Sequence, residues 1–108
     1  MFLYYPVNKE GQPMKKVDKL FVRIDYKNPD LNSSPKDFQQ HVDYLNTIAS
    51  ERYFVGGGFN NVKGGMIIFE AKDIKEAKAI AENDPLIKRN FYTFELYEWE
   101  LFILSKGN

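Results

Sequence analysis

The sequence contains no cysteine and only one histidine, and its 15 basic and 15 acidic side chains leave a formal net charge of zero. Without cysteine the chain has no disulfides, thiolate nucleophiles or cysteine-based zinc sites, and this composition fits a reducing cytosol. One histidine and no cysteine leave only a carboxylate-rich metal site, for which the sequence shows no spacing signature, so we expect no metal. We also expect no cofactor. Balanced charge argues against nucleic-acid partners, which are held by a basic surface.

Long apolar runs and several catalytic signatures are missing too. No segment approaches the roughly 18 consecutive apolar residues of a membrane helix, and residues 1–9 lack the basic start of a signal peptide. The chain has neither the Gly-x-Ser-x-Gly of a serine hydrolase nor the Gly-Lys-Ser/Thr of a phosphate-binding loop. These absences predict a cytoplasmic protein without a membrane partner, a bound nucleotide or a serine nucleophile.

The chain of 108 residues is long enough for one domain, and its apolar periodicity predicts the elements of that domain. Two segments carry apolar residues at helical spacing, and four alternate or run apolar as strands do. Their order predicts β-α-β-β-α-β, the α+β ferredoxin-like sandwich with both helices on one face of the sheet. The expected strands are 17–26, 53–59, 65–71 and 91–104, and the expected helices are 34–52 and 73–83, followed by a short connection at 86–90.

Capping residues mark where both helices begin. Ser34 is followed by Pro35 and Asp37, and Asp73 is followed three residues later by Glu76, which predicts a capping box at each start. The domain is expected to span residues 18–104, with a tail at 105–108. Residues 1–17 form an N-terminal extension, for which an added edge strand, a dimer arm and disorder all remain open.

The first long strand alternates between two sets of side chains, and the more apolar set is expected beneath the helices. That assignment leaves Phe21, Arg23 and Asp25 on the uncovered face of the sheet. The run at 65–71 is apolar almost throughout, which predicts a strand buried on both sides. Because the last strand carries large apolar groups on both faces, we expect two copies to form a homodimer through their sheets. The alternative is a monomer with scattered surface aromatics.

The single histidine, His41, lies on the apolar stripe of the first expected helix, close to Leu45 and Ile48. Asp84 continues the stripe of the second helix, four residues after Ile80. A buried polar group without a partner costs about 2–7 kcal/mol, and these two could satisfy each other. In a dyad, Asp84 would fix the tautomer of His41 and leave the imidazole to move a proton. The structural alternatives are a buried hydrogen-bonded pair without chemistry, or two separate roles, a satisfied core histidine and Asp84 as the cap of the Asp-Pro turn.

Further residues are candidates for substrate binding, each with a structural alternative. Arg23 could hold a substrate carboxylate bidentately, or pair with Asp25 or with a partner chain. Gly57 and Gly58 belong to an all-glycine run that could let backbone amides bind an anion, or could form a flexible hairpin end. Phe59 follows this run and is counted with it.

Several motifs occur together in the chain: His41, Gly56–Phe59, Gly64–Ala71, Glu76-Ala77, Asn83-Asp84-Pro85 and Phe94–Trp99. Together they resemble the YCII-related (YciI-like) family, small bacterial proteins with a dimeric α+β barrel arrangement. The resemblance covers roughly residues 18–100, and the Asp-Pro step after an alanine-bearing helix with an upstream histidine is its most specific part. The sequence departs from the family in its extension at 1–17 and in an all-glycine run where Gly-Pro is common, which predicts a more mobile loop.

The resemblance implies an enzyme with a His–Asp pair near a pocket, and it maps that pair onto His41 and Asp84. The wider fold group includes lactone- and phenol-processing proteins. We therefore expect a small cytosolic enzyme that uses acid–base chemistry for isomerisation, lactone handling or elimination on a small organic molecule. The alternatives are a non-catalytic ligand-binding or stress-associated dimeric module, and an accessory subunit of a larger enzyme.

Overall fold

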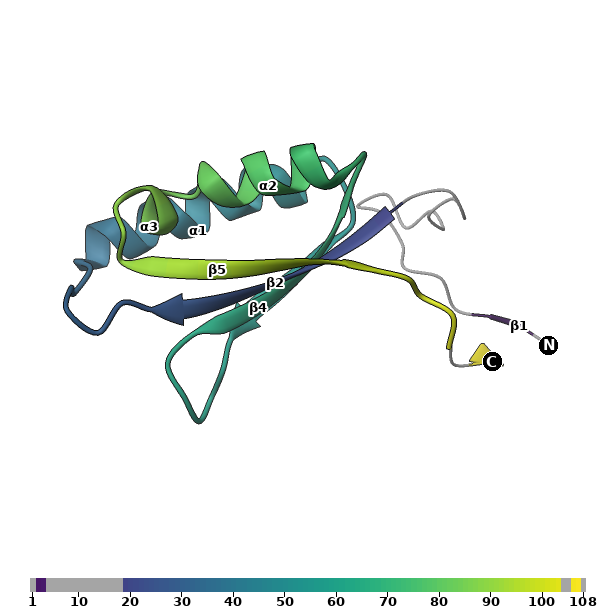
Figure 1. Cartoon of the computed structure of the whole chain (residues 1–108), viewed down its shortest axis with the longest axis horizontal. Helices are drawn as coiled ribbons and strands as arrows, with labels where there is room; N and C mark the ends of the chain where they lie inside the picture. Colours follow the sequence, from purple (N-terminus) through teal and green to yellow (C-terminus); the bar gives the residue numbers. More distant parts are fainter. Residues whose placement is uncertain (1, 4–18, 104–105, 108) are drawn as a thin grey trace.

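Four strands form one antiparallel sheet, and the helices cover one of its faces (Figure 1). The computed structural model describes residues 2–3, 19–103 and 106–107. The strand order β3-β4-β2-β5 confirms the ferredoxin-like α+β prediction. In these residues no helix is long and apolar enough to cross a membrane. The elements of this layer pair are β2 (Lys19–Lys27), α1 (Pro35–Ala49), β3 (Phe54–Gly58), β4 (Gly65–Ala71), α2 (Ile74–Glu82), α3 (Pro85–Lys88) and β5 (Tyr92–Trp99).

The helices begin at the predicted caps. At α1, the Ser34 hydroxyl accepts from the Asp37 amide at 3.1 Å and the Asp37 carboxylate accepts from the Ser34 amide at 2.8 Å, so the capping box is complete. At α2, Asp73 accepts from the Glu76 amide, but the Glu76 carboxylate accepts from the Lys72 amide instead of the cap. The predicted connection at 86–90 is wrong in part, because residues 85–88 form the helical turn α3.

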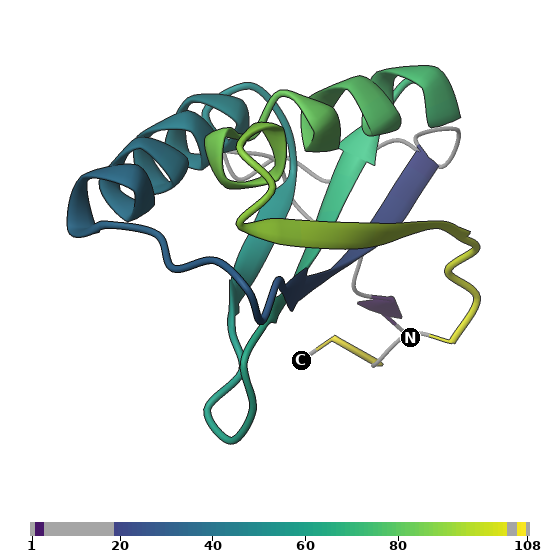
Figure 2. The ribbon, with the colours of Figure 1, turned by 60° about the vertical axis from the view of Figure 1, so that its left-hand side comes forward.

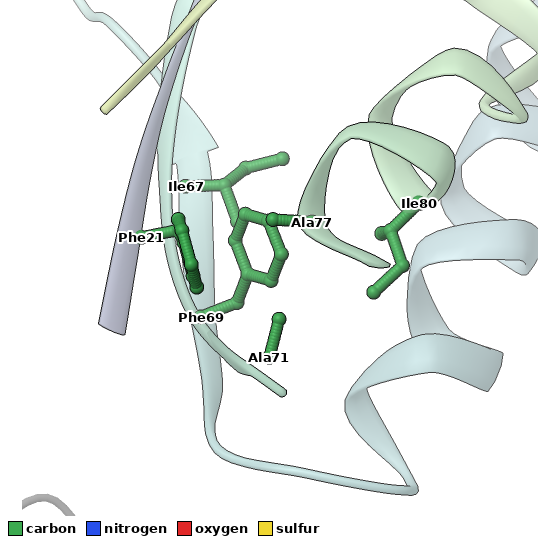
Figure 3. Close-up of a cluster of buried hydrophobic side chains, with 6 residues drawn as sticks. All are labelled: Phe21, Ile67, Phe69, Ala71, Ala77 and Ile80. Atoms are coloured by element: carbon green, nitrogen blue, oxygen red, sulfur yellow. The ribbon is translucent and has the colours of Figure 1, made fainter. Parts of the chain in front are cut away.

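The apolar core lies between the sheet and α2 (Figure 3). Phe21 and Phe69 stand on neighbouring strands with ring centroids 6.1 Å apart, and both are at most 1% exposed. Ala77 and Ile80 of α2 close this layer from above, where small side chains let the helix approach the rings. The core thus fixes α2, and with it the chain that leads to Asp84.

The two faces of the sheet are the reverse of the sequence prediction. Phe21, Arg23 and Asp25 lie on the face beneath the helices, which we call the covered face, and each is at most 8% exposed. The other face, the open face, carries the alternating apolar residues. On that side the β4 side chains are exposed or half-buried, so β4 is not buried on both sides. The arginine can lie on the covered face because two carboxylates pair with it there. The open face carries Val22, Ile24, Tyr26, Val55, Met66, Ile68, Tyr97 and Trp99.

Both ends of the chain differ from the predicted strands. β5 ends at Trp99, opposite Leu20, instead of continuing to residue 104, because its partner β2 begins at Lys19. Of the extension at 1–17, the structure describes β1 (Phe2–Leu3), which pairs with β6 (Lys106–Gly107) in a separate two-stranded sheet. The rest of the extension lies outside the described residues, and the domain boundaries stay predictions.

Candidate active site

The structure brings His41 and Asp84 together across the α1–α3 junction. His41 Nδ1 lies 2.8 Å from each carboxylate oxygen of Asp84. Asp84 also caps α3 by accepting from the Leu86 amide at 3.0 Å, so the sequence alternatives, pairing and capping, hold at once. With Asp84 as acceptor, Nδ1 carries the hydrogen, and Nε2 is the nitrogen left for a ligand.

Two polar links hold α1 in the place where its histidine meets Asp84. The Tyr44 hydroxyl donates to the Ile80 carbonyl at 2.8 Å, which ties the middle of α1 to α2. Arg89, just past α3, forms an ion pair with Asp37 in the first turn of α1 at 2.9 Å. One link precedes His41 along α1 and the other follows it, so both sides of the histidine are tied to neighbouring elements.

Arg23 joins Asp84 to a second carboxylate. Its Nε and Nη2 donate to the two oxygens of Asp25 at 2.7 and 3.0 Å, and Nη2 also donates to Asp84 at 2.8 Å. The predicted ion pair with Asp25 is confirmed, and the predicted position on the uncovered face is wrong. Arg23 is 1% exposed, with its guanidinium carbon 5.9 Å from the centroid of the Phe94 ring. Arg23 therefore holds the carboxylates of Asp25 and Asp84 in fixed positions through these hydrogen bonds.

The environment treats the two aspartates differently. Burial raises the pKa of Asp25, outweighing the charge and hydrogen bonds of Arg23. Burial acts in the same direction on Asp84, but the hydrogen bond from His41 and the charge of Arg23 outweigh it and lower the pKa of Asp84. Asp84 is thus held ionised as a fixed anion, while Asp25 is the carboxylate whose charge is costlier to maintain.

A cleft of about 540 Å³ opens beside the dyad, between α1 and the β3–β4 strands. This volume lies in the usual range for small-molecule sites, roughly 300–1,000 Å³. His41 and Asp25 both line the cleft, whereas Arg23 and Asp84 lie behind them. Most of the wall is apolar or glycine backbone, and its other lining residues include Phe38, Val42, Leu45, Phe54, Gly56, Gly57, Gly58, Gly64, Ile67, Leu86 and Tyr92.

The predicted glycine segment has a different structure from the expected loop. Gly57 and Gly58 are the last residues of β3, paired with β4, and they line the cleft as strand backbone. Phe59 is 40% exposed and starts the β3–β4 turn, which extends beyond the sheet in Figure 2, and it is not part of the cleft wall. Binding of a substrate by these three residues stays a prediction.

Sequence reasoning missed two contributors to the cleft. Asp25 was visible only as a partner for Arg23, although its position two residues further along a strand puts both on one face. Gly64 has a φ of +119°, and a Cβ there would collide with the Asp25 carbonyl oxygen, so only glycine lets the turn approach β2 so closely. The turn contains Asn60, Asn61 and Gly64, residue types that tolerate a positive φ, but this composition does not predict the contact with β2.

His41, Asp84, Arg23 and Asp25 form one charged cluster, and its net charge suits the binding of a single proton. Arg23 contributes +1 and the two aspartates −2, so the net charge is −1 with a neutral imidazole and 0 after one proton is bound. Uptake of one proton therefore neutralises the cluster, which suits transfer to and from a ligand. Within the described residues, no group of three or more His, Asp or Glu side chains could hold a metal ion.

A family model places the chain among known proteins. The model of the YCII-related domain matches residues 19–100, which contain the sheet, the helices and the cleft. This chain belongs to the YCII-related family. The recognition made from the sequence motifs is thereby confirmed.

Two known proteins extend the comparison of this YCII-related chain. The uncharacterised protein YjpA of Bacillus subtilis (strain 168) is 31% identical over 62 residues, which cover 56% of this chain and 73% of YjpA. A solved structure, the 5-chloro-2-hydroxyhydroquinone dehydrochlorinase TftG of Burkholderia phenoliruptrix AC1100 in complex with 2,5-dihydroxybenzoquinone, matches with a TM-score of 0.65. At 23% identity, covering 75% of this chain and 93% of TftG, it shows that the two share a fold.

Proposed function

We propose that this YCII-related protein is a small cytosolic enzyme in which His41 transfers a proton and Asp84 orients the imidazole of His41. The 2.8 Å contact between His41 Nδ1 and Asp84, at the edge of a cleft, is the observation that carries this role. A buried carboxylate that accepts from Nδ1 fixes the imidazole in one tautomer and balances the positive charge that forms on it. Asp84 is 0% exposed, so it acts through His41 and does not reach a ligand.

The proposed step needs no group beyond the ligand and the dyad. Nε2 takes a proton from a carbon or hydroxyl of the ligand, and the electron pair left behind moves into the ligand. In an isomerisation, the imidazolium returns the proton to another ligand atom. In an elimination, the electron pair expels a leaving group, and the imidazolium gives its proton to water. Because both outcomes start from the same proton transfer, the geometry at His41 serves either.

The fold neighbour gives the first substrate class to try. TftG is named as a dehydrochlorinase, an enzyme that removes a proton and chloride from its substrate, and it was solved with a quinone. Apolar rings in the present cleft, among them Phe38, Phe54 and Tyr92, suit a ring-shaped ligand of that size. We therefore favour elimination from a halogenated hydroquinone over isomerisation or lactone chemistry.

The test is chloride release from 5-chloro-2-hydroxyhydroquinone and related halohydroquinones by the wild-type protein and by His41→Gln. Glutamine keeps a hydrogen-bonding group at position 41 but does not titrate near neutral pH. We expect kcat/KM to fall about a hundredfold to ten-thousandfold, the usual contribution of a general base. The control is Asp43→Asn on the solvent side of the same helix, which is expected to keep full turnover.

Two outcomes would contradict this function. Equal turnover by His41→Gln would remove the histidine from the chemistry. Saturable binding of the halohydroquinones without any conversion would instead favour the alternative of a non-catalytic ligand-binding module.

We also propose that two copies associate through their open faces. Large apolar side chains on this face are 39–51% exposed in the protomer, an arrangement typical of a protein interface. A second copy is the simplest partner, because a two-fold axis lets the same face cover itself. Residues Tyr26, Val55, Met66, Tyr97 and Trp99 form this exposed apolar set.

A further inference from the structure

The feature that the dyad leaves unexplained is the carboxylate of Asp25. It is 8% exposed, on the covered face of β2, and it lines the same cleft as His41. A carboxylate buried to this degree has a desolvation cost, which the guanidinium of Arg23 does not fully offset. Arg23 lies on the side away from the cleft, so the carboxylate is held against the ligand space from behind.

We infer that Asp25 is the ligand-contacting carboxylate of the cleft, and that it selects a neutral ring hydroxyl, a phenol or an enol, over a carboxylate ligand. This inference rests on the proposed function for the cleft but concerns recognition, not proton transfer. Arg23 donates to both oxygens of Asp25, the arrangement of an ionised carboxylate. A carboxylate offers about four acceptor positions, so capacity remains for a hydroxyl donor.

Charge in the cleft argues against the anion binding that the sequence suggested for Arg23. The guanidinium is 1% exposed and its Nε and Nη2 donate to Asp25 and Asp84, so Arg23 does not present a bidentate fork to the cleft. A ligand carboxylate would instead face the carboxylate of Asp25 across an apolar wall, where like charges repel strongly. A hydroxyl group avoids this repulsion and donates a hydrogen bond to a charged acceptor, one of the stronger kinds.

The test compares three ligands of one shape at a pH where the phenol is neutral. The probes are phenol, anisole, which lacks the O–H donor, and benzoate, which carries a charge, each titrated calorimetrically into the full chain at neutral pH. We expect the phenol to bind about tenfold to a hundredfold more tightly than either of the others, as expected for a hydrogen bond to a charged group. Asp25→Asn should weaken phenol binding and tighten benzoate binding, which reverses or removes the preference.

The control variant is Glu95→Gln, which removes a carboxylate from the open face and should leave all three affinities unchanged. If Asp25→Asn does not fold, the wild-type ligand series decides alone. Anisole or benzoate binding as tightly as phenol, saturation by none of the three, or an unchanged order in folded Asp25→Asn would overturn the inference. Because no turnover is measured, phenol preference without any catalysis would contradict only the proposed enzyme function. Turnover that depends on His41, without phenol preference, would contradict only the role of Asp25.

Discussion

The two faces of the sheet distribute polarity in opposite ways. The covered face, which lies beneath the helices, holds Arg23 and Asp25 and meets Asp84 at the start of α3, all at most 8% exposed. The open face holds a carboxylate as well, Glu95, but surrounds it with exposed aromatic rings, and Tyr97 donates to it at 2.7 Å. The protein thus places its charges where a ligand cleft can use them and leaves apolar surface where a partner can cover it.

The same chemical group behaves differently on the two faces. Hydrogen bonds from Tyr26 and then Tyr97 lower the pKa of Glu95, with burial a minor opposing effect. For Asp84 burial is the largest single influence, and the hydrogen bonds and charges of His41 and Arg23 outweigh it. A charge on the open face therefore needs little support in the protomer, whereas a charge on the covered face depends on every partner it has.

The largest expected effect is on the covered face, where removal of the Arg23 charge should lower the free energy of unfolding. Arg23→Met keeps an apolar stem but leaves two buried carboxylates next to each other without a cation. Breaking a buried ion pair in this way costs about 3–5 kcal/mol, so the free energy of unfolding from urea titration should fall by that amount. Lys19→Met is the matched control on the same strand, where an exposed pair with Glu98 at 3.4 Å predicts a change below about 0.5 kcal/mol. Equal losses for both variants would contradict the difference between buried and exposed charge.

The reversal of the two faces shows a limit of prediction from sequence alternation. Alternation in β2 correctly separated Phe21, Arg23 and Asp25 from their neighbours, but alternation does not say which set is covered. Asp84, 61 positions away from Arg23, determines which set is covered, because its carboxylate stabilises the buried guanidinium. A contact of that range leaves no periodic signal in either segment.

Local signals, by contrast, predicted elements and contacts well. The Ser34 capping box and the apolar stripes fixed the position of α1, and with it the histidine that meets Asp84. Strand ends were less predictable, since the last aromatic segment alternates beyond Trp99 although β2 offers no partner there. The cleft could not be predicted, because Asp25 enters it only through the register of β2 and the close approach of Gly64.

A second prediction uses pH to compare the two buried aspartates. The pKa of Asp84 is lowered from 3.8, so its ionised form stabilises the fold above that value, and this stabilisation is lost as pH falls through the lowered pKa. The pKa of Asp25 is raised from 3.8, so its stabilisation is complete below that value and is lost as pH rises through the raised pKa. The two groups therefore contribute opposite slopes to stability against pH.

The measurement is urea unfolding of Asp84→Asn and Asp25→Asn from neutral to acid pH. Relative to wild type, Asp84→Asn should lose about 1–3 kcal/mol at neutral pH, the usual effect for a charged buried hydrogen-bond partner, and the deficit should shrink on acidification. The free energy of unfolding of Asp25→Asn, relative to that of wild type, should be highest at neutral pH and should fall in acid. Parallel curves for the two variants would mean that the shared arginine makes the carboxylates equivalent.

The smallest expected effect is on the open face and appears only in the assembly. Tyr97→Lys places a cation at the middle of this face, where it can still reach Glu95, so the protomer should fold. In a two-fold dimer the substitution occurs twice at one interface, and each ammonium group must lose water when the faces meet. Sedimentation equilibrium should show the dimer dissociation constant rising about tenfold or more.

Ile74→Lys, an equally apolar exposed position on the helix side, is the control and should leave association unchanged. A monomeric wild-type protein, or a dimer that Ile74→Lys disrupts and Tyr97→Lys does not, would move the interface away from the open face and leave its exposed rings without a partner.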